Sequence, residues 1–476
     1  MRCWHLVALV LVACTPQGNR PPSVAPIAAA PPPPQPQVFD VAAIDTWVTA
    51  ILERHEVVGA QLVIAKDGDV VLMRSYGHVA VGGDAVTDET AFAIGSVTKQ
   101  FVCVAALKLE AQGKIAMTDP VAKYWPNLTR AADVTLDDLG SHLSGYADFY
   151  PLDFLDRRMQ QSIEHDALIA EYAGRPLDFE PRTKWSYSNT GFIMLGRLVE
   201  KQTGVALGKW MGEQLFVPAQ MEHASLDPPD DAWGLARGHL RFALGDPEPV
   251  RREAPGWIFA AGGIYASASD LMRWNFALAG DALLAAEAKR KLTTPRVLTD
   301  GRSTDYGCGL GVRNQGGEVI WSHSGAVSGF LAFNAFVPRT KTGVTLLVNT
   351  EGAAVGDMHQ AVLGLALAPA QGVPVIAGKP AADVAKEIFV GLQAGTLDPS
   401  KAGEELVAFY DSKRLAAAKS RLGTLGAPTR VEVDRPRERG GMEVTSVRVV
   451  LGDRTLRATM FRSTDGLVQQ FLVLAE

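Results

Sequence analysis

The chain has 476 residues, with 46 Lys and Arg against 52 Asp and Glu, and a formal net charge of -6 at pH 7. This length exceeds what one hydrophobic core usually supports, so a large domain with a smaller one is expected. The contents of 47% hydrophobic and 21% charged residues are typical of a globular enzyme, and the negative charge without any Lys/Arg-rich run excludes nucleic acid as a partner.

The first 14 residues predict a secretory signal. Arg2 precedes an apolar run that is too short to cross a bilayer as a helix. The run ends in Leu11-Val12-Ala13-Cys14, which resembles a bacterial lipobox and implies cleavage before Cys14 and lipidation of that residue. The alternative is an ordinary cleaved signal with an incidental cysteine. The lipobox implies export and a lipid anchor at the periplasmic face, and Thr15 in place of Asp favours the outer membrane by resemblance to lipoprotein sorting.

Residues 15–38 predict a disordered tether. This segment is rich in proline, including the run 31–34, and holds almost nothing that could pack. Such a composition favours extended polyproline geometry. We therefore expect the tether to hold a folded domain away from a lipid surface.

The cysteines do not indicate a disulfide framework. Cys3 would leave with the signal and Cys14 would carry the lipid, so that only Cys103 and Cys308 remain among the four. Cys103 falls on the same face of a predicted helix as Ser96, where a small buried thiol is the usual role of a cysteine. The sequence thus predicts no disulfide framework and a small buried thiol at Cys103.

The main domain, expected over 39–370, is predicted to contain an antiparallel sheet. A helical pattern at 41–56 leads into β-rich runs at 61–65 and 70–77 around a Lys-Asp-Gly-Asp turn, which is typical of a hairpin. A mostly helical region follows to about residue 278, and further strands are expected at 306–312, 318–321, 329–337 and 343–348, before a closing helix at 358–367. Together these elements predict an α+β fold, an antiparallel sheet flanked by helices with an inserted helical region.

A proline-containing linker at 371–380 separates this domain from a predicted small α+β domain at 381–476. The small domain has helical patterns at 381–392 and 404–422, followed by strands at 429–433, 443–451, 455–461 and 467–474. It offers no catalytic cluster, so we expect a binding or covering module.

Ser96 and Lys99 stand three residues apart at the start of an apolar helix that ends at Gly113. At this spacing the two side chains share one helical face, and the helix amino end favours an ionised oxygen. This arrangement suits a serine nucleophile, although serine is also an ordinary capping residue. Lys99 either has a pKa lowered by desolvation or acts as a cation that lowers the pKa of a neighbour such as Tyr187.

Three motifs occur in one order along the chain: Ser96-Val97-Thr98-Lys99, Tyr187-Ser188-Asn189 and His323-Ser324-Gly325. This set resembles serine β-lactamases and penicillin-binding proteins. With tyrosine as its first residue, the second motif resembles that of the class C-like branch of these proteins, which includes D-aminopeptidases and esterases. The resemblance implies a β-lactamase/transpeptidase-like fold over residues 40–370, and the tail resembles the small domain often appended to these hydrolases.

The resemblance also implies roles for individual residues. Ser96 would be acylated, Lys99 would activate it, and Tyr187 would relay protons to the leaving atom and from the hydrolytic water. Asn189 would position the substrate and Lys99, and Gly325 would lie on the strand whose next residue, Ala326, donates its backbone amide to the oxyanion together with that of Ser96. Neither a metal nor an organic cofactor is implied.

His323 departs from the pattern, because β-lactamases and many penicillin-binding proteins carry a lysine there. With an unperturbed pKa near 6.5, this side chain would be mostly neutral at pH 7. If His323 helps to bind a carboxylate, affinity should fall between about pH 6 and 7. A purely structural hydrogen-bonding role is the alternative.

The leading hypothesis is a lipid-anchored serine hydrolase that cleaves an amide or ester bond of a small-molecule or peptide substrate, with an esterase or D-peptidase favoured over an efficient β-lactamase. A rival is a penicillin-binding or sensor protein that uses the same pocket without turnover. A Ser-His-Asp esterase is disfavoured, because no Gly-x-Ser-x-Gly elbow surrounds Ser96.

Overall fold

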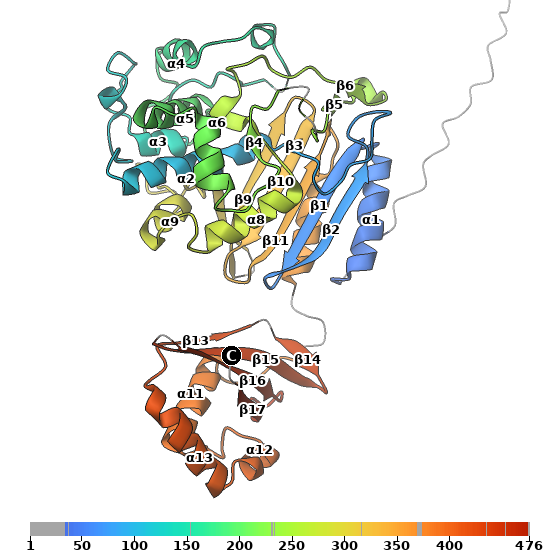
Figure 1. The fold of residues 1–476 in the computed structure, drawn as a ribbon, viewed down its shortest axis with the longest axis vertical. Coiled ribbons are helices and arrows are strands. Elements are labelled where there is room, and N and C mark those ends of the chain that lie inside the picture. Colours follow the sequence, from blue (N-terminus) through green and yellow to red (C-terminus); the bar gives the residue numbers. More distant parts are fainter. Residues whose placement is uncertain are drawn as a thin grey trace, which may run out of the picture.

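The computed structural model describes residues 34–474, except 37, 153, 230, 231, 233, 316, 369–373, 435 and 453. The expected signal, the lipidation site Cys14 and nearly all of the expected tether lie outside the described residues. Figure 1 shows a larger body that runs from α1 to α10 and a smaller one that runs from α11 to β17. In the part of the chain that the structure describes, no helix is both long and apolar enough to span a membrane.

Six described strands form one sheet in the larger body, in the order β2-β1-β11-β10-β9-β8. All of its paired neighbours are antiparallel, which confirms the predicted antiparallel sheet. The strands are β1 (Gly59–Lys66), β2 (Asp69–Gly77), β8 (Gly311–Gln315), β9 (Glu318–Val327), β10 (Phe330–Val337) and β11 (Thr342–Val348).

Helices cover both faces of this sheet (Figure 1). Along β1, Leu62 and Ile64 pack into one core with α1 (Val41–Arg54) and α10 (Gly356–Leu367). The alternate residue Val63 packs into a second core with α2 (Thr98–Ala111) and α8 (Ala268–Ala279). Because successive strand residues point to opposite faces, a strand buried on both sides becomes a continuous apolar run.

The helical region lies between β3 and β8 in the sequence. The predicted helix near 191–202 is α5 (Thr190–Thr203), which ends at Gly204 in the left-handed conformation with φ 71°. The region also contains α3 (Leu136–Gly140), α4 (His165–Ala173), α6 (Leu207–Met211), α7 (Phe259–Gly262) and α9 (Ala286–Thr293). Short strands β3 (Phe92–Ala93), β4 (Ser225–Leu226) and β7 (Ile264–Ala266) form one small sheet, and β5 (His239–Leu240), β6 (Glu248–Pro249) and β12 (Thr350–Glu351) form another.

The smaller body is an α+β unit with its own apolar core. Its strands are β13 (Arg430–Val433), β14 (Arg437–Arg439), β15 (Met442–Leu451), β16 (Arg454–Arg462) and β17 (Val468–Leu474), and its helices are α11 (Ala381–Ala394), α12 (Glu404–Phe409) and α13 (Ser412–Leu422). The helix predicted over 404–422 is two helices, because the Asp411 side chain accepts a hydrogen bond from Arg414 N and caps α13.

The segment 306–310, predicted as the start of a strand, is a loop, and β8 begins only at Gly311. This loop lies against α2, where the backbone approaches closely: a Cβ on Gly309 would lie 2.3 Å from the carbonyl oxygen of Lys99. Gly309 therefore serves close packing against α2, and the segment is a loop rather than a strand.

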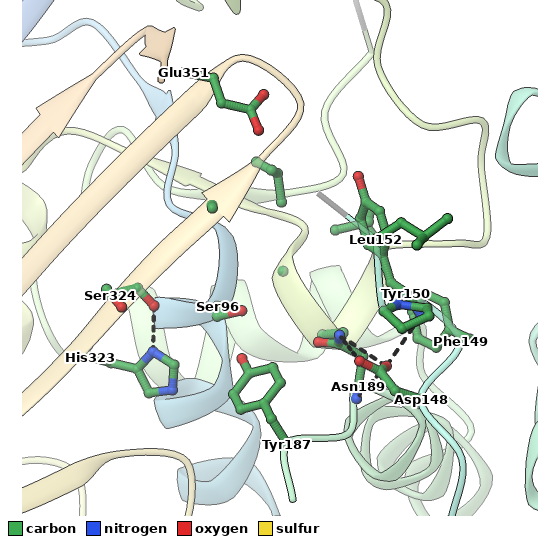
Figure 2. Close-up of a pocket in the computed structure, with 16 residues that line it drawn as sticks. Ser96, Asp148, Phe149, Tyr150, Leu152, Tyr187, Asn189, His323, Ser324 and Glu351 are labelled. Atoms are coloured by element: carbon green, nitrogen blue, oxygen red, sulfur yellow. Dashed lines mark hydrogen bonds between the residues drawn. The ribbon is translucent and has the colours of Figure 1, made fainter. Parts of the chain in front are cut away.

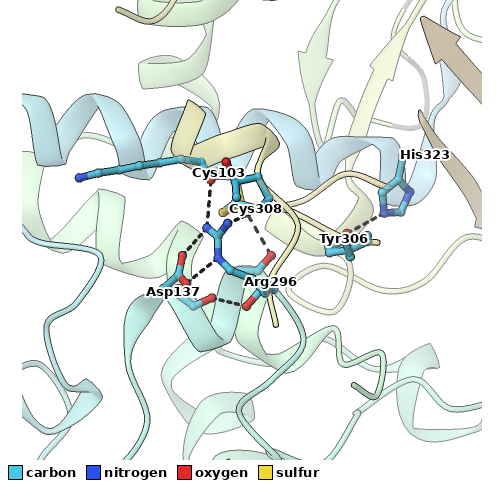
Figure 3. The surroundings of a disulfide bond; sticks show 10 residues. Cys103, Asp137, Arg296, Tyr306, Cys308 and His323 are labelled. Atoms are coloured by element: carbon cyan, nitrogen blue, oxygen red, sulfur yellow. Dashed lines mark hydrogen bonds and ion pairs between the residues drawn. A yellow bond between two sulfur atoms is a disulfide. The ribbon is translucent and has the colours of Figure 1, made fainter. Parts of the chain in front are cut away.

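The prediction that no disulfide forms, with Cys103 as a buried thiol, is wrong. Cys103 of α2 and Cys308 of this loop form a disulfide across 205 residues of sequence, with their Cα atoms 5.7 Å apart. Figure 3 shows the bond beside the ion pair between Arg296 and Asp137. Burial on a helix face was predicted for Cys103, but its partner becomes a neighbour only when the loop folds onto α2.

Candidate active site

Ser96 lies in a short 3-10 turn, Gly95–Val97, that leads directly into α2. Lys99 follows one turn later, and its Nζ lies 3.0 Å from the Ser96 hydroxyl oxygen. The three-residue spacing therefore brings the two groups into hydrogen-bond contact. This is the geometry that a serine nucleophile requires from its base.

Lys99 is completely buried and has three partners. Besides Ser96, its Nζ donates to Asn189 Oδ1 over 2.8 Å and to the carbonyl oxygen of Ala261 over 2.7 Å. Burial lowers the pKa of Lys99 to about 7, and the negative charge of Asp148 opposes the decrease. A neutral amine has two hydrogens and one lone pair, so two hydrogens can serve Asn189 and Ala261 while the lone pair faces the Ser96 hydroxyl.

Asp148 fixes the orientation of Asn189, a contact that the sequence analysis missed. Its Oδ1 accepts hydrogen bonds from Asn189 N over 3.0 Å and Nδ2 over 3.1 Å. Since only the NH₂ side of an amide donates, Asn189 must turn its Oδ1 toward Lys99. The only signal for Asp148 in the sequence was its position two residues after Ser141-His142-Leu143-Ser144-Gly145-Tyr146, a stretch that also resembles the family.

Tyr187 faces the same hydroxyl from the second motif. Lys99 Nζ lies 4.8 Å from the centre of the Tyr187 ring. Burial raises the pKa of Tyr187, and a hydrogen bond with Ser96 opposes the rise. Of the two alternatives for Lys99, the geometry favours the desolvated base, because Tyr187 stays a neutral phenol.

His142 packs against Tyr187, with ring centres 4.2 Å apart. Its Nδ1 accepts a hydrogen bond from Ser188 N over 3.0 Å. Burial, together with the charges of Lys99 and His323, holds the pKa of His142 well below its usual range. A neutral ring therefore supports the tyrosine, and no role for His142 was predicted from the sequence.

Gly325 and Ala326 lie on β9 beside the nucleophile. Strand β8 pairs with β9 only at residues 318–322. Residues 323–327 of β9 therefore have β10 on one edge and the backbone at Ser96 on the other. A Cβ on Gly325 would lie 2.0 Å from Ile94 O and 3.0 Å from Ser96 N. Glycine therefore allows β9 to approach until the amides of Ser96 and Ala326 can serve one oxyanion.

Both ring nitrogens of His323 have partners. Nε2 lies 2.9 Å from the Tyr306 hydroxyl and Nδ1 lies 2.5 Å from the carbonyl oxygen of Ser324. A carbonyl can only accept, so Nδ1 carries the proton and Nε2 accepts from Tyr306. Burial and the charge of Lys99 lower the pKa of His323 to about 4. The titration expected between pH 6 and 7 is therefore displaced, and His323 is neutral at neutral pH.

These groups open into one cavity of about 410 Å³, shown in Figure 2. The residues that line it are Ser96, Asp148, Phe149, Tyr150, Pro151, Leu152, Tyr187, Asn189, Ile258, Ala261, Gly262, His323, Ser324, Ala326, Val327 and Glu351. Among the residues that the structure describes, no group of three or more His, Cys, Asp or Glu is arranged to hold a metal ion.

A family model described as Beta-lactamase matches residues 44–368, which is more than half of the chain. The chain belongs to the beta-lactamase family. This membership confirms the resemblance drawn from the three motifs. The match ends at the last residue before the undescribed segment 369–373, so it covers the larger body and leaves the smaller one out.

This beta-lactamase family member is similar to a D-aminopeptidase from Brucella anthropi, with 27% identity over 346 residues. The match covers 71% of this chain and 64% of the relative, so the chain spans less than two thirds of that protein's length.

Two solved structures share the fold of this beta-lactamase family member. A D-amino acid amidase from Ochrobactrum anthropi SV3 is 20% identical, covers 68% of this chain and 98% of its own, and has a TM-score of 0.59. An octameric penicillin-binding protein homologue from Pyrococcus abyssi is also 20% identical, with a TM-score of 0.61, and covers 91% of this chain and 100% of its own. This second structure therefore shares the fold over more of the chain than the region that the family model matches.

Proposed function

We propose that this protein is a serine hydrolase that cleaves an amide bond through an acyl-enzyme on Ser96. The observation that carries the proposal is the buried Lys99, whose pKa of about 7 lets it accept a proton from a hydroxyl 3.0 Å away at neutral pH. The same buried lysine would have no comparable use in a protein that binds its ligand without forming an acyl-enzyme.

In acylation, the Ser96 oxygen attacks the carbonyl carbon while its proton passes to Lys99. The carbonyl oxygen becomes an oxyanion between the amides of Ser96 and Ala326. The carbon–nitrogen bond then breaks as the leaving nitrogen takes the proton of the Tyr187 hydroxyl, and the proton held by Lys99 restores Tyr187. The amine product leaves, and the acyl group stays on Ser96.

In deacylation, a water molecule takes the place of the amine. It loses a proton through Tyr187 to Lys99 as its oxygen attacks the ester carbon. The ester bond to Ser96 breaks, and Lys99 returns the proton to the serine oxygen. The carboxylic acid leaves and the starting enzyme is restored.

The substrate class that we favour is an amide or short peptide with a D-amino acid residue on the acyl side. Support comes from the names of the similar proteins, a D-aminopeptidase and a D-amino acid amidase. The neutral His323 also lacks the fixed positive charge that a lysine supplies in β-lactamases, which favours a peptidase or amidase over an efficient β-lactamase.

A panel of nitrocefin, p-nitrophenyl esters and D- and L-amino acid p-nitroanilides tests this function, with Ser96→Ala run in parallel. We expect Ser96-dependent turnover of D-amino acid anilides and little turnover of nitrocefin. A single burst of product without steady turnover on every substrate would instead indicate a sensor or binding protein.

We also propose that the protein is exported and anchored by a lipid on Cys14, with the outer membrane favoured. Support comes from the lipobox-like sequence and from the Cys103–Cys308 disulfide, because disulfides persist mainly in oxidising compartments outside the cytoplasm. Fractionation of cells that express the wild type or Cys14→Ser tests this. Wild-type protein in the soluble fraction would contradict the anchor.

A further inference from the structure

Among the residues that the structure describes, the charged side chains that line the catalytic cavity are all acidic. Of the described residues that line it, Asp148 and Glu351 carry carboxylates, and none is a lysine or an arginine. The amino group of Lys99 is completely buried and is held by Ser96, Asn189 and Ala261. The cavity therefore presents negative charge to the part of a substrate that lies beside the nucleophile.

The two carboxylates differ in their surroundings. Asp148 accepts hydrogen bonds from the backbone and side chain of Asn189 and from Tyr150 N, so it serves the catalytic asparagine. Glu351 lies on the short strand β12 and accepts a hydrogen bond from Gly329 N over 2.9 Å. A carboxylate has about four lone-pair positions, and the amide of Gly329 fills one of them.

Glu351 lies at the end of the cavity away from His323. Gly329 belongs to the turn between β9 and β10, just beyond Val327. Figure 2 shows His323 and Ser324 at one end of this part of β9 and Glu351 near the other end, with Ser96 between them. The two ends of the cavity thus differ in charge, with a neutral imidazole at one and a carboxylate at the other.

The catalytic groups set the direction of the substrate. Tyr187 must reach the leaving nitrogen, and its ring centre lies 6.4 Å from that of His323, so the leaving group belongs on the His323 side. With the carbonyl oxygen held between Ser96 and Ala326, the acyl part extends the other way, toward Val327 and Glu351. The α-carbon of the acyl residue carries the amino nitrogen and the side chain. One of these two groups therefore approaches Glu351.

A second carboxylate reinforces the negative potential at this end. Glu253 accepts hydrogen bonds from the Tyr150 hydroxyl and the Ser328 hydroxyl, both over 2.8 Å. Burial and the charges of Glu253 and Glu351 raise the pKa of Tyr150. The Ser328-Gly329 turn thus holds one carboxylate on each side, because Ser328 binds Glu253 and Gly329 binds Glu351.

We propose that Glu351 recognises the free α-ammonium group of the residue on the acyl side, which makes the enzyme selective for substrates with an unblocked amino terminus. This inference rests on the proposed function, since it assigns a specificity residue to the same cavity. An ammonium group beside Glu351 would have its charge compensated, whereas an N-acetyl group would place a neutral amide against a carboxylate.

The test compares D-alanine p-nitroanilide with N-acetyl-D-alanine p-nitroanilide, which share a leaving group and differ in the charge of the amino nitrogen. The variants are Glu351→Gln, which removes the charge, Glu351→Asp, which keeps it, and Glu287→Gln as a control on the exposed surface of α9. For Glu351→Gln we expect kcat/KM to fall about 10- to 100-fold for the free amine and by less than about threefold for the acetylated substrate. Glu351→Asp should recover part of the loss, and Glu287→Gln should match the wild type.

The outcomes separate the two proposals. Equal losses on both substrates, or a wild-type preference for the acetylated anilide, would overturn the role of Glu351 while leaving Ser96-dependent hydrolysis in place. Absence of Ser96-dependent turnover with both anilides and the wider panel would overturn the proposed function and this inference with it. The acetylated substrate also reports folding, because a misfolded variant loses activity on both.

Discussion

Tyr306 donates its hydroxyl to Nε2 of His323 over 2.9 Å, and the disulfide at Cys308 ties the same loop to the helix that carries Lys99. The His323-Ser324-Gly325 motif is therefore tied to helix α2 through this loop, in addition to its pairing within the sheet. Figure 3 shows the Cys103–Cys308 bond and the Tyr306–His323 contact, to which the same loop contributes Cys308 and Tyr306. The neutrality of His323 and the position of the loop are consequences of the same packing.

Loss of the disulfide should lower both stability and activity. We expect Cys103→Ser with Cys308→Ser to reduce the free energy of unfolding by about 2 to 5 kcal/mol, because the bond closes a long loop. Chemical denaturation of the oxidised wild type and the double variant measures this difference, with intact mass confirming the oxidised state. Equal midpoints would show that the loop is held without the bond.

The pH dependence of acylation should follow Lys99. Its pKa is lowered to about 7, so the neutral base is present above that pH and is lost as pH falls through it. We expect kcat/KM to rise with pH through about 7. Lys99→Arg, which stays charged, should lose about a thousandfold or more of kcat, whereas Lys114→Arg on the exposed surface should retain the wild-type profile. A profile that falls through pH 7 would contradict the role of base.

His323 should not titrate near neutrality. Its pKa is lowered to about 4, so its charge is lost as pH rises through that value and it is neutral from about pH 5 upward. Proton NMR of the imidazole signals, assigned with His323→Gln, checks this directly. Tyr306→Phe removes the donor to Nε2 and should shift the His323 signals. A midpoint near pH 6.5 in the wild type would contradict this account.

Asp148→Asn should weaken catalysis through Asn189. The new amide no longer forces Nδ2 of Asn189 toward it, so the Oδ1 contact with Lys99 loses its orientation. The lost charge-assisted hydrogen bonds are worth about 1.5 to 3 kcal/mol, or roughly 10- to 100-fold in kcat. Asp148→Glu keeps the charge and should recover part of the activity. An unchanged kcat in Asp148→Asn would show that Asn189 is held by other contacts.

Gly325→Ala should separate β9 from the nucleophile turn. The added Cβ would lie 2.0 Å from Ile94 O, so the strand must move and carry Ala326 N away from the oxyanion. Loss of one such donor lowers kcat about 100- to 1,000-fold. Steady-state kinetics with an unblocked D-amino acid anilide measures the loss, and circular dichroism verifies the fold. Full activity would place the oxyanion elsewhere.

Local features of the chain were sufficient to predict many of its helices and strands and the contact between Ser96 and Lys99. Apolar periodicity located α1, α2, α5 and α10, and β-rich runs with turns located the hairpin of β1 and β2. The spacing of Ser96 and Lys99 predicted their contact, because residues three apart on a helix are neighbours wherever the helix lies. The order of the three motifs indicated the family.

Tertiary structure decided what depends on distant segments. Three features depend on residues that are far apart in the sequence or belong to no motif. They are the Cys103–Cys308 bond, the hydrogen bond from Asn189 to Asp148 and the position of Glu351 in the cavity. The pKa values of Lys99 and His323 also belong here, since burial by many segments lowers both. Sequence spacing determines local neighbours, whereas desolvation and long-range contacts exist only after the chain has packed.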